Sequence, residues 1–108
     1  MELHYYVRSD GRSPFQDWFA ALEVGARARV ATAIVRLGQG NTSNVESIGG
    51  GVFEYRVHSG PGYRVYFGRD GTALIILLSG GTKNRQQRDI EAAHKMWRDY
   101  KLRKRTSF

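Results

Sequence analysis

The feature that most constrains this chain is a change in hydrophobic period at residue 52, where apolar and polar residues begin to alternate. Alternation indicates a half-buried strand, because successive side chains on a strand point to opposite faces of the sheet. It runs over residues 52–58 and again over 63–67, and the turn residues 59–62 lie between the two runs. These residues therefore predict a β-hairpin.

A third strand is predicted directly after this hairpin. Arg69-Asp70-Gly71 is a second tight-turn signal, and residues 73–78 are apolar on both faces. A short run of that kind is typical of a strand that lies between other strands and is covered on both sides. The three strands together form an antiparallel meander, which is the centre of the predicted fold.

The segment before the meander predicts a strand and two helices. Residues 3–7 are apolar or aromatic apart from His4, so the chain opens with a strand. Ser13 is a good N-cap, Pro14 suits the first helical position, and Gln16 completes a capping box. The apolar residues that follow recur at helical spacing and form one face: Phe15, Trp18, Phe19 and Leu22.

The second helix is predicted to end at Gly38 and to be separated from the first by a break at Val24-Gly25. We expect its apolar stripe to consist of four residues: Ala28, Ala31, Ile34 and Val35. Residues 41–51 are polar and glycine-rich and are expected to form a loop.

A loop at residues 80–83 and a final helix are expected after the meander. Asn84 and Gln87 have the spacing of an N-cap and a capping box. The buried stripe of this helix is expected to be Ile90, Ala93, Met96, Trp97 and Tyr100. The basic run 101–105 is interpreted as a frayed helix end or a solvated tail. The chain thus reads as one α+β domain over residues 1–108, with an N-terminal strand and helical hairpin on a mostly antiparallel, curved sheet and a C-terminal helix.

Composition excludes several classes of protein. A chain of 108 residues, 41% hydrophobic and 25% charged, is typical of one folded domain and unlike a disordered chain. The absence of cysteine excludes disulfides, thiolate metal sites and cysteine nucleophiles. The three histidines lie on separate predicted elements, so we expect no metal and no small-molecule cofactor. With no secretory signal and no long apolar run, a cytoplasmic location without membrane association is expected.

The net charge is the first indication of function. Seventeen lysines and arginines against ten acidic residues give a formal charge of +7. A field of this sign attracts polyanions, and nucleic acid is the leading class of partner. The alternative is that the charge serves solubility alone.

The polar face of the meander concentrates this charge. Glu54, Arg56 and His58 are expected to share a patch with Arg64 and Tyr66, because cross-strand neighbours on one face lie about 5 Å apart. The loop after the third strand is expected to bring Lys83 to the same rim. Guanidinium groups bind phosphate oxygens in pairs, and fixed cations stabilise charge that grows on a phosphodiester in the transition state. The alternative interpretation is an exposed, salt-bridged sheet face in which Glu54 pairs with a neighbouring arginine.

Five segments in this order resemble the RelE/ParE toxin superfamily, and within it the HigB-like addiction-module killer proteins related to phage Gp49. The segments cover nearly the whole chain: Pro14-Phe15-x-x-Trp18, Phe53-Glu54-Tyr55-Arg56-Val57, Gly60-Pro61-Gly62-Tyr63-Arg64-Val65-Tyr66-Phe67, Leu77-Leu78 with Gly80-Gly81-Thr82-Lys83, and Asp89-Ile90-Glu91-Ala92-Ala93. The resemblance implies the fold predicted above. It also implies ribosome-dependent cleavage of mRNA, held in check by a cognate antitoxin that is often a helix-turn-helix DNA-binding protein.

The resemblance also implies the site residues. Arg56, Arg64 and Lys83 match basic positions of the ribosome-dependent nucleases, and Glu54 takes a place where some relatives have lysine. We therefore expect Arg56, Arg64, Lys83 and Glu54 to be catalytic. The residues expected to bind substrate are His58, Tyr66, Arg85 and Arg88. Some relatives place an aromatic residue or a histidine where this chain has Arg88-Asp89-Ile90.

The reaction expected from this set is metal-free attack of the RNA 2′-hydroxyl on the adjacent phosphate. Arg56 and Arg64 would bind the phosphate, while Glu54 or His58 would act as base and Lys83 would stabilise or protonate the leaving oxygen. Two competing functions remain open at this point. One is a DNA gyrase poison of the ParE type, and the other is a non-catalytic module that binds nucleic acid or an antitoxin.

Overall fold

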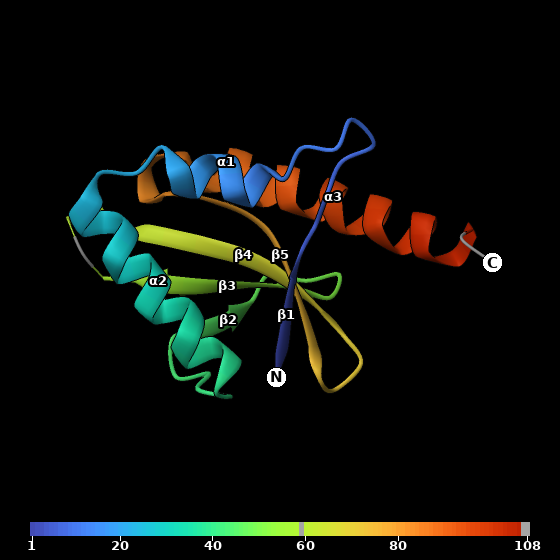
Figure 1. Ribbon diagram of the computed structural model, residues 1–108, viewed down its shortest axis with the longest axis horizontal. Helices are drawn as coiled ribbons and strands as arrows, with labels where there is room; N and C mark the ends of the chain where they lie inside the picture. Colours follow the sequence, from blue (N-terminus) through green and yellow to red (C-terminus); the bar gives the residue numbers. More distant parts are fainter. Residues whose placement is uncertain (59, 107–108) are drawn as a thin grey trace.

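The sheet of this protein is covered by helices on both faces (Figure 1). The computed structural model describes residues 1–58 and 60–106. The described elements follow one another along the chain as β1 (Glu2–Tyr5), α1 (Pro14–Ala20), α2 (Val24–Gly38), β2 (Val45–Ser47), β3 (Val52–Val57), β4 (Tyr63–Asp70), β5 (Leu74–Thr82), the 3₁₀ turn η1 (Lys83–Arg85) and α3 (Gln86–Thr106). None of the described helices is both long enough and apolar enough to cross a membrane.

The strand order is β1-β5-β4-β3-β2, with every pair antiparallel except β1 and β5. The predicted α+β class and the meander of β3, β4 and β5 are confirmed. β5 lies between β1 and β4, and its residues Ile75 to Leu78 are buried, as the run of apolar residues predicted. Part of the predicted turn at 59–62 falls on Ser59, which lies outside the described residues.

Two apolar clusters hold the helices on opposite faces of the sheet. One joins Phe15 of α1 and Val30 of α2 to alternate side chains of β3, β4 and β5, such as Tyr55. The other joins Ala93 and Trp97 of α3 to the intervening side chains of the same strands. The two-residue period of the strands thus divides the apolar side chains between the two faces.

The start of α1 is formed as predicted. Ser13 Oγ accepts a hydrogen bond of 3.2 Å from the Gln16 amide, and Pro14 occupies the first turn. The break between the helices comes slightly earlier than expected, because α2 begins at Val24 with Glu23 as its N-cap. The first strand also ends earlier, at Tyr5 rather than at residue 7.

The predicted stripe of α2 was wrong except at Ile34, which is partly buried and packs against the core. The buried residues are Ala26, Val30, Ala33 and Leu37, whereas Val35 is 57% exposed. The predicted and the observed sets both have helical spacing in this alanine-rich helix, so the hydrophobic period alone does not show which set is buried. The buried set places two alanines against the sheet, where their small side chains allow close approach.

Three segments predicted as irregular belong to regular structure. β2 lies within the expected loop 41–51, and β5 continues through Gly80 and Gly81 to Thr82. Asn84 does not cap the last helix, because it lies in η1 and α3 begins at Gln86. The basic run 101–105 is helical, and the last turns of α3 extend past the sheet (Figure 1).

Polar contacts tie the distal half of α3 to the rest of the fold. Tyr6 donates a hydrogen bond of 2.6 Å to Asp99, and Tyr100 donates one of 2.8 Å to Asp70 at the end of β4. The ammonium of Lys104 lies 2.5 Å from the same carboxylate of Asp70. These contacts explain why the basic run continues the helix instead of fraying.

The packing of the Trp97 ring against Gly68 sets the distance between α3 and the sheet. A Cβ on Gly68 of β4 would lie 2.3 Å from Cε3 of the buried Trp97. Gly68→Ala should therefore lower the free energy of unfolding by about 1–3 kcal/mol through overpacking. Thermal or denaturant unfolding measures the loss, and Thr72→Ala, in the exposed turn that follows β4, is the control. Equal stability of the two variants would contradict this packing.

The Asp70 contacts predict a specific loss of stability in acid. The hydrogen bonds from Lys104 and Tyr100 hold the pKa of Asp70 below its ordinary value of 3.8. A lowered pKa in the folded state contributes stability above the unfolded pKa, and this contribution is lost as the pH falls through the folded value. The unfolding free energy of Asp70→Asn should fall less than that of the wild type between about pH 6 and about pH 3. Denaturant titrations at both pH values measure this, and an equal fall would refute the assignment.

Candidate nucleic-acid interface

The last residues of β3 and β5 and the first residues of β4 lie together at one end of the sheet. Arg56 on β3 is directly opposite Arg64 on β4, and Tyr63 at the start of β4 is opposite Thr82 at the end of β5. The next residue, Lys83, donates its amide hydrogen to the carbonyl oxygen of Gly62 over 3.1 Å. The strand register therefore brings Arg56, Arg64 and Lys83 to the same end of the sheet.

These ends enclose an open hollow of about 600 Å³, which we call the strand-end hollow. It is lined by Arg56, Val57, His58, Gly60, Pro61, Gly62, Tyr63, Arg64 and Lys83. Four of the residues predicted from the sequence, Arg56, His58, Arg64 and Lys83, thus lie around one space. No carboxylate is among the described residues that line it, so the hollow is cationic.

Two carboxylates that do not line the hollow balance the positive charge of the paired arginines. Arginines directly opposite each other on neighbouring strands destabilise a sheet unless their charge is balanced. Glu46 of β2 lies 2.9 Å from Arg56, and Glu54 of β3 lies 3.9 Å from Arg64. Glu46 was missed from the sequence because β2 has only three residues, too few for alternation to distinguish it from a loop.

Glu54 does not line the hollow. Its side chain is only 4% exposed and lies beneath the start of α3, where Gln86 Nε2 donates to its two oxygens over 3.1 and 3.4 Å. The side chain of Arg64 is 13% exposed, and its Nε has no hydrogen-bond partner within the described residues. Glu54 is therefore placed to orient the guanidinium of Arg64 from behind, not to contact a bound molecule.

Tyr66 is also inside the protein. It is fully buried, and its hydroxyl has no hydrogen-bond partner among the residues described. Burial raises the pKa of Tyr66, and the nearby charges of Glu54 and Asp89 raise it further. The hydroxyl is therefore protonated at neutral pH, and it lies behind the hollow instead of on its surface.

The start of α3 packs closely against the end of β5. A Cβ on Gly81 would lie 2.0 Å from Asp89 Oδ2, so a larger residue at this strand position would require the Asp89 carboxylate to move. Burial raises the pKa of Asp89, against the opposing effect of the charges on Arg85 and Arg88. Both arginines are exposed on η1 and α3, and neither is among the residues that line the hollow.

The histidines do not form a metal site with acidic residues in the described part of the chain, where no three potential ligands cluster. His4 contacts Glu2, and His94 bonds to the carbonyl oxygens of Ile48 and Gly49. His58 is the histidine that lines the hollow.

Comparison with known proteins identifies the family. Residues 17–98 match the family described as phage-derived protein Gp49-like. A protein of Haemophilus influenzae (strain Rd), named only as an uncharacterized protein, is 40% identical over 80 residues, which are 73% of this chain and 81% of that protein. The chain belongs to the Gp49-like family of RelE-toxin-like proteins, a family associated with toxins of toxin–antitoxin modules.

The difference between the two carboxylates predicts different effects of their removal. Glu54→Gln leaves the charge of the largely buried Arg64 unbalanced and should lower the free energy of unfolding by about 1.5–3 kcal/mol. Glu46→Gln removes an exposed partner of Arg56 and should lower it by about 0–1 kcal/mol. Denaturant unfolding of both variants measures the difference. Equal losses would show that the buried pair is not the stronger constraint.

Proposed function

We propose that this protein is the toxin of a type II toxin–antitoxin module and that it cleaves mRNA on the ribosome. The observation that carries the proposal is the convergence of Arg56, Arg64 and Lys83 on the strand-end hollow. Membership of the Gp49-like family supports the toxin role, and resemblance to the HigB-like proteins supports RNA as the substrate. The activity is that of a metal-independent endoribonuclease.

In this proposal the hollow binds a single phosphodiester. Arg64 is largely buried with the Glu54 carboxylate 3.9 Å away, and Arg56 lies opposite it on the neighbouring strand, so that two guanidinium groups contact the phosphate oxygens. Their fixed charges stabilise the additional negative charge of the transition state. Because arginine remains protonated, other side chains must transfer the protons.

His58 and Lys83 line the same hollow and supply the two proton transfers. His58 accepts the proton of the RNA 2′-hydroxyl as its oxygen bonds to phosphorus. The bond between phosphorus and the 5′ oxygen breaks, and Lys83 donates a proton to the leaving oxygen. The products are a cyclic 2′,3′-phosphate and a 5′-hydroxyl. Such acid–base assistance contributes about 10²–10⁴ in rate, which leaves orientation of the RNA to the ribosome.

The partners in this proposal are the ribosome with its mRNA and a cognate antitoxin. A chain with a formal charge of +7 is complementary to an acidic partner surface. The antitoxin is proposed to be a helix-turn-helix DNA-binding protein that neutralises the toxin.

Replacement of a single arginine tests the proposal. Arg64→Ala should reduce the rate of transcript cleavage in a translating extract by about 10²–10³, as loss of one donor to the transition state does. The readout is mapping of transcript 5′ ends. Arg98→Ala removes the same charge from an exposed position on α3, outside the hollow, and should cleave at nearly the wild-type rate.

Two results would contradict the proposal. One is full activity of a correctly folded Arg64→Ala variant. The other is inhibition of DNA supercoiling by gyrase without any cleavage of ribosome-bound transcripts, which would identify a gyrase poison instead.

A further inference from the structure

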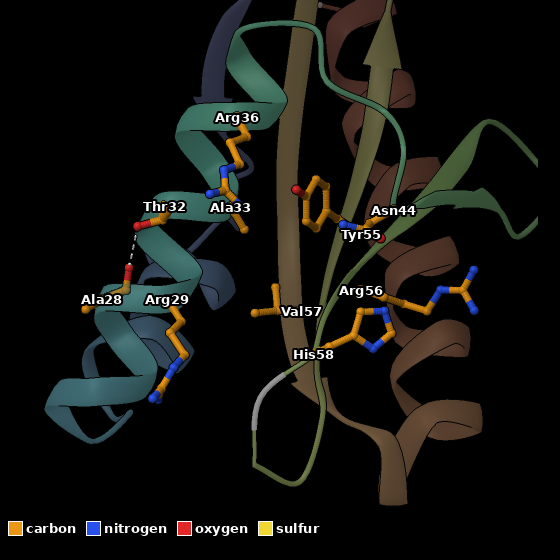
Figure 2. Close-up of a pocket in the computed structure, with 10 residues that line it drawn as sticks. All are labelled: Ala28, Arg29, Thr32, Ala33, Arg36, Asn44, Tyr55, Arg56, Val57 and His58. Carbon is orange, nitrogen blue, oxygen red and sulfur yellow. Dashed lines mark hydrogen bonds between the residues drawn. The ribbon is translucent and has the colours of Figure 1, made fainter.

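A second basic groove lies between α2 and β3, as Figure 2 shows. Its volume is about 450 Å³, and we call it the α2 groove. Arg29 and Arg36 lie along one side of α2, while Tyr55 and Val57 point towards the helix from β3. Asn44, from the loop before β2, lines the same groove.

Arg29 and Arg36, the two groove arginines on α2, have no ion-pair partner within the described residues. Both are exposed. They are seven residues apart on α2, which places them about 10 Å apart along the helix axis. No acidic side chain is among the described residues that line the groove. This spacing suits two successive negative groups better than one small anion.

The α2 groove adjoins the strand-end hollow across the end of β3. The same three residues, Arg56, Val57 and His58, line both spaces. Figure 2 shows Arg56 and His58 directed to the side of β3 opposite α2, while Val57 points towards the helix. The end of β3 is thus a ridge with Arg29 and Arg36 on one side and the cations of the hollow on the other. A flexible polyanion that crosses this ridge stays close to positive charge along its path.

We infer that the α2 groove binds the phosphates of the nucleotides next to the cleavage site, so that single-stranded RNA passes from the hollow over the end of β3 to Arg29 and Arg36. The inference rests on the proposed function. A polymer bound in the hollow must leave it, and this path presents arginines that match phosphate oxygens in charge and geometry. The groove therefore extends the site from one phosphodiester to several nucleotides.

The test compares two double variants of equal charge. Arg29→Ala with Arg36→Ala removes the groove cations, and Arg27→Ala with Arg98→Ala removes two arginines outside both spaces. Binding is measured by fluorescence anisotropy with single-stranded RNAs of about three and about twelve nucleotides, each with a 2′-deoxy substitution that blocks cleavage, over a range of salt concentrations.

The groove variant should bind the long RNA about tenfold more weakly and the short RNA within about twofold of the wild type. Loss of two phosphate contacts should also make the slope of log K against log salt shallower by about 1.4 for the long RNA. The control variant should change the slope much less. Thermal unfolding of the groove variant should match the wild type, because Arg29 and Arg36 are exposed, and the same measurement checks the fold of the control variant, in which Arg27 is partly buried.

Three further outcomes separate the possibilities. Unchanged affinity and slope for the long RNA, while the wild type still cleaves ribosome-bound transcripts, would overturn the groove and leave the proposed function intact. Loss of affinity for the antitoxin with unchanged RNA binding would assign the groove to a protein partner and also overturn the inference. Length-dependent loss of RNA binding by the groove variant, with no cleavage by the wild type, would support the groove and refute the nuclease.

Discussion

The contact between Glu54 and Arg64 beneath the start of α3 is the interaction on which the candidate site depends. The Glu54 carboxylate is removed from water, accepts a hydrogen bond from Gln86 and lies 3.9 Å from the guanidinium, where the start of α3 covers the polar face of the sheet. This contact requires α3 to lie close to β5, and Gly81 provides the space for Asp89 to do so. Because its side chain is only 13% exposed, Arg64 loses less freedom on binding an anion than an exposed arginine does.

Acidic residues pair with cations of the sheet and of the end of α3. Arg56 and Arg64 have carboxylate partners on the sheet, while Arg103 and Lys104 pair with Asp99 and Asp70 and hold α3 in place. Arg29 and Arg36 of the α2 groove form no ion pair with any described residue. Both are exposed, so a polyanion attracted by the formal charge of +7 can reach them.

Much of the fold was accessible from the sequence because its strongest signals are local. Ser13 and Pro14 specify a helix start by their own chemistry, and alternation along β3 and β4 assigns each side chain to a face. The same alternation puts Arg56 and Arg64 on one face of the hairpin, and the strand register sets them directly opposite each other. This register brings the two arginines to the strand-end hollow, so sequence alone could anticipate the cationic side chains that line it.

What the sequence did not reveal depends on contacts between distant segments. Nothing near Glu54 or Tyr66 indicates that α3, some thirty residues later, covers the polar face that alternation marked as exposed. The rotation of α2 is set by where its alanines pack, which also decides that Arg29 and Arg36 face the groove. Strand β2 is too short to show an alternation of apolar and polar residues, so neither the strand nor its residue Glu46 was predicted.

The chemical nature of the RNA ends gives the most direct test of the central claim, that these cations promote attack within the RNA itself. Transcripts recovered from ribosomes after induction of this protein should carry a cyclic 2′,3′-phosphate upstream of the cut and a 5′-hydroxyl downstream. A 5′-phosphate at the downstream fragment would require an external water nucleophile and would contradict the account.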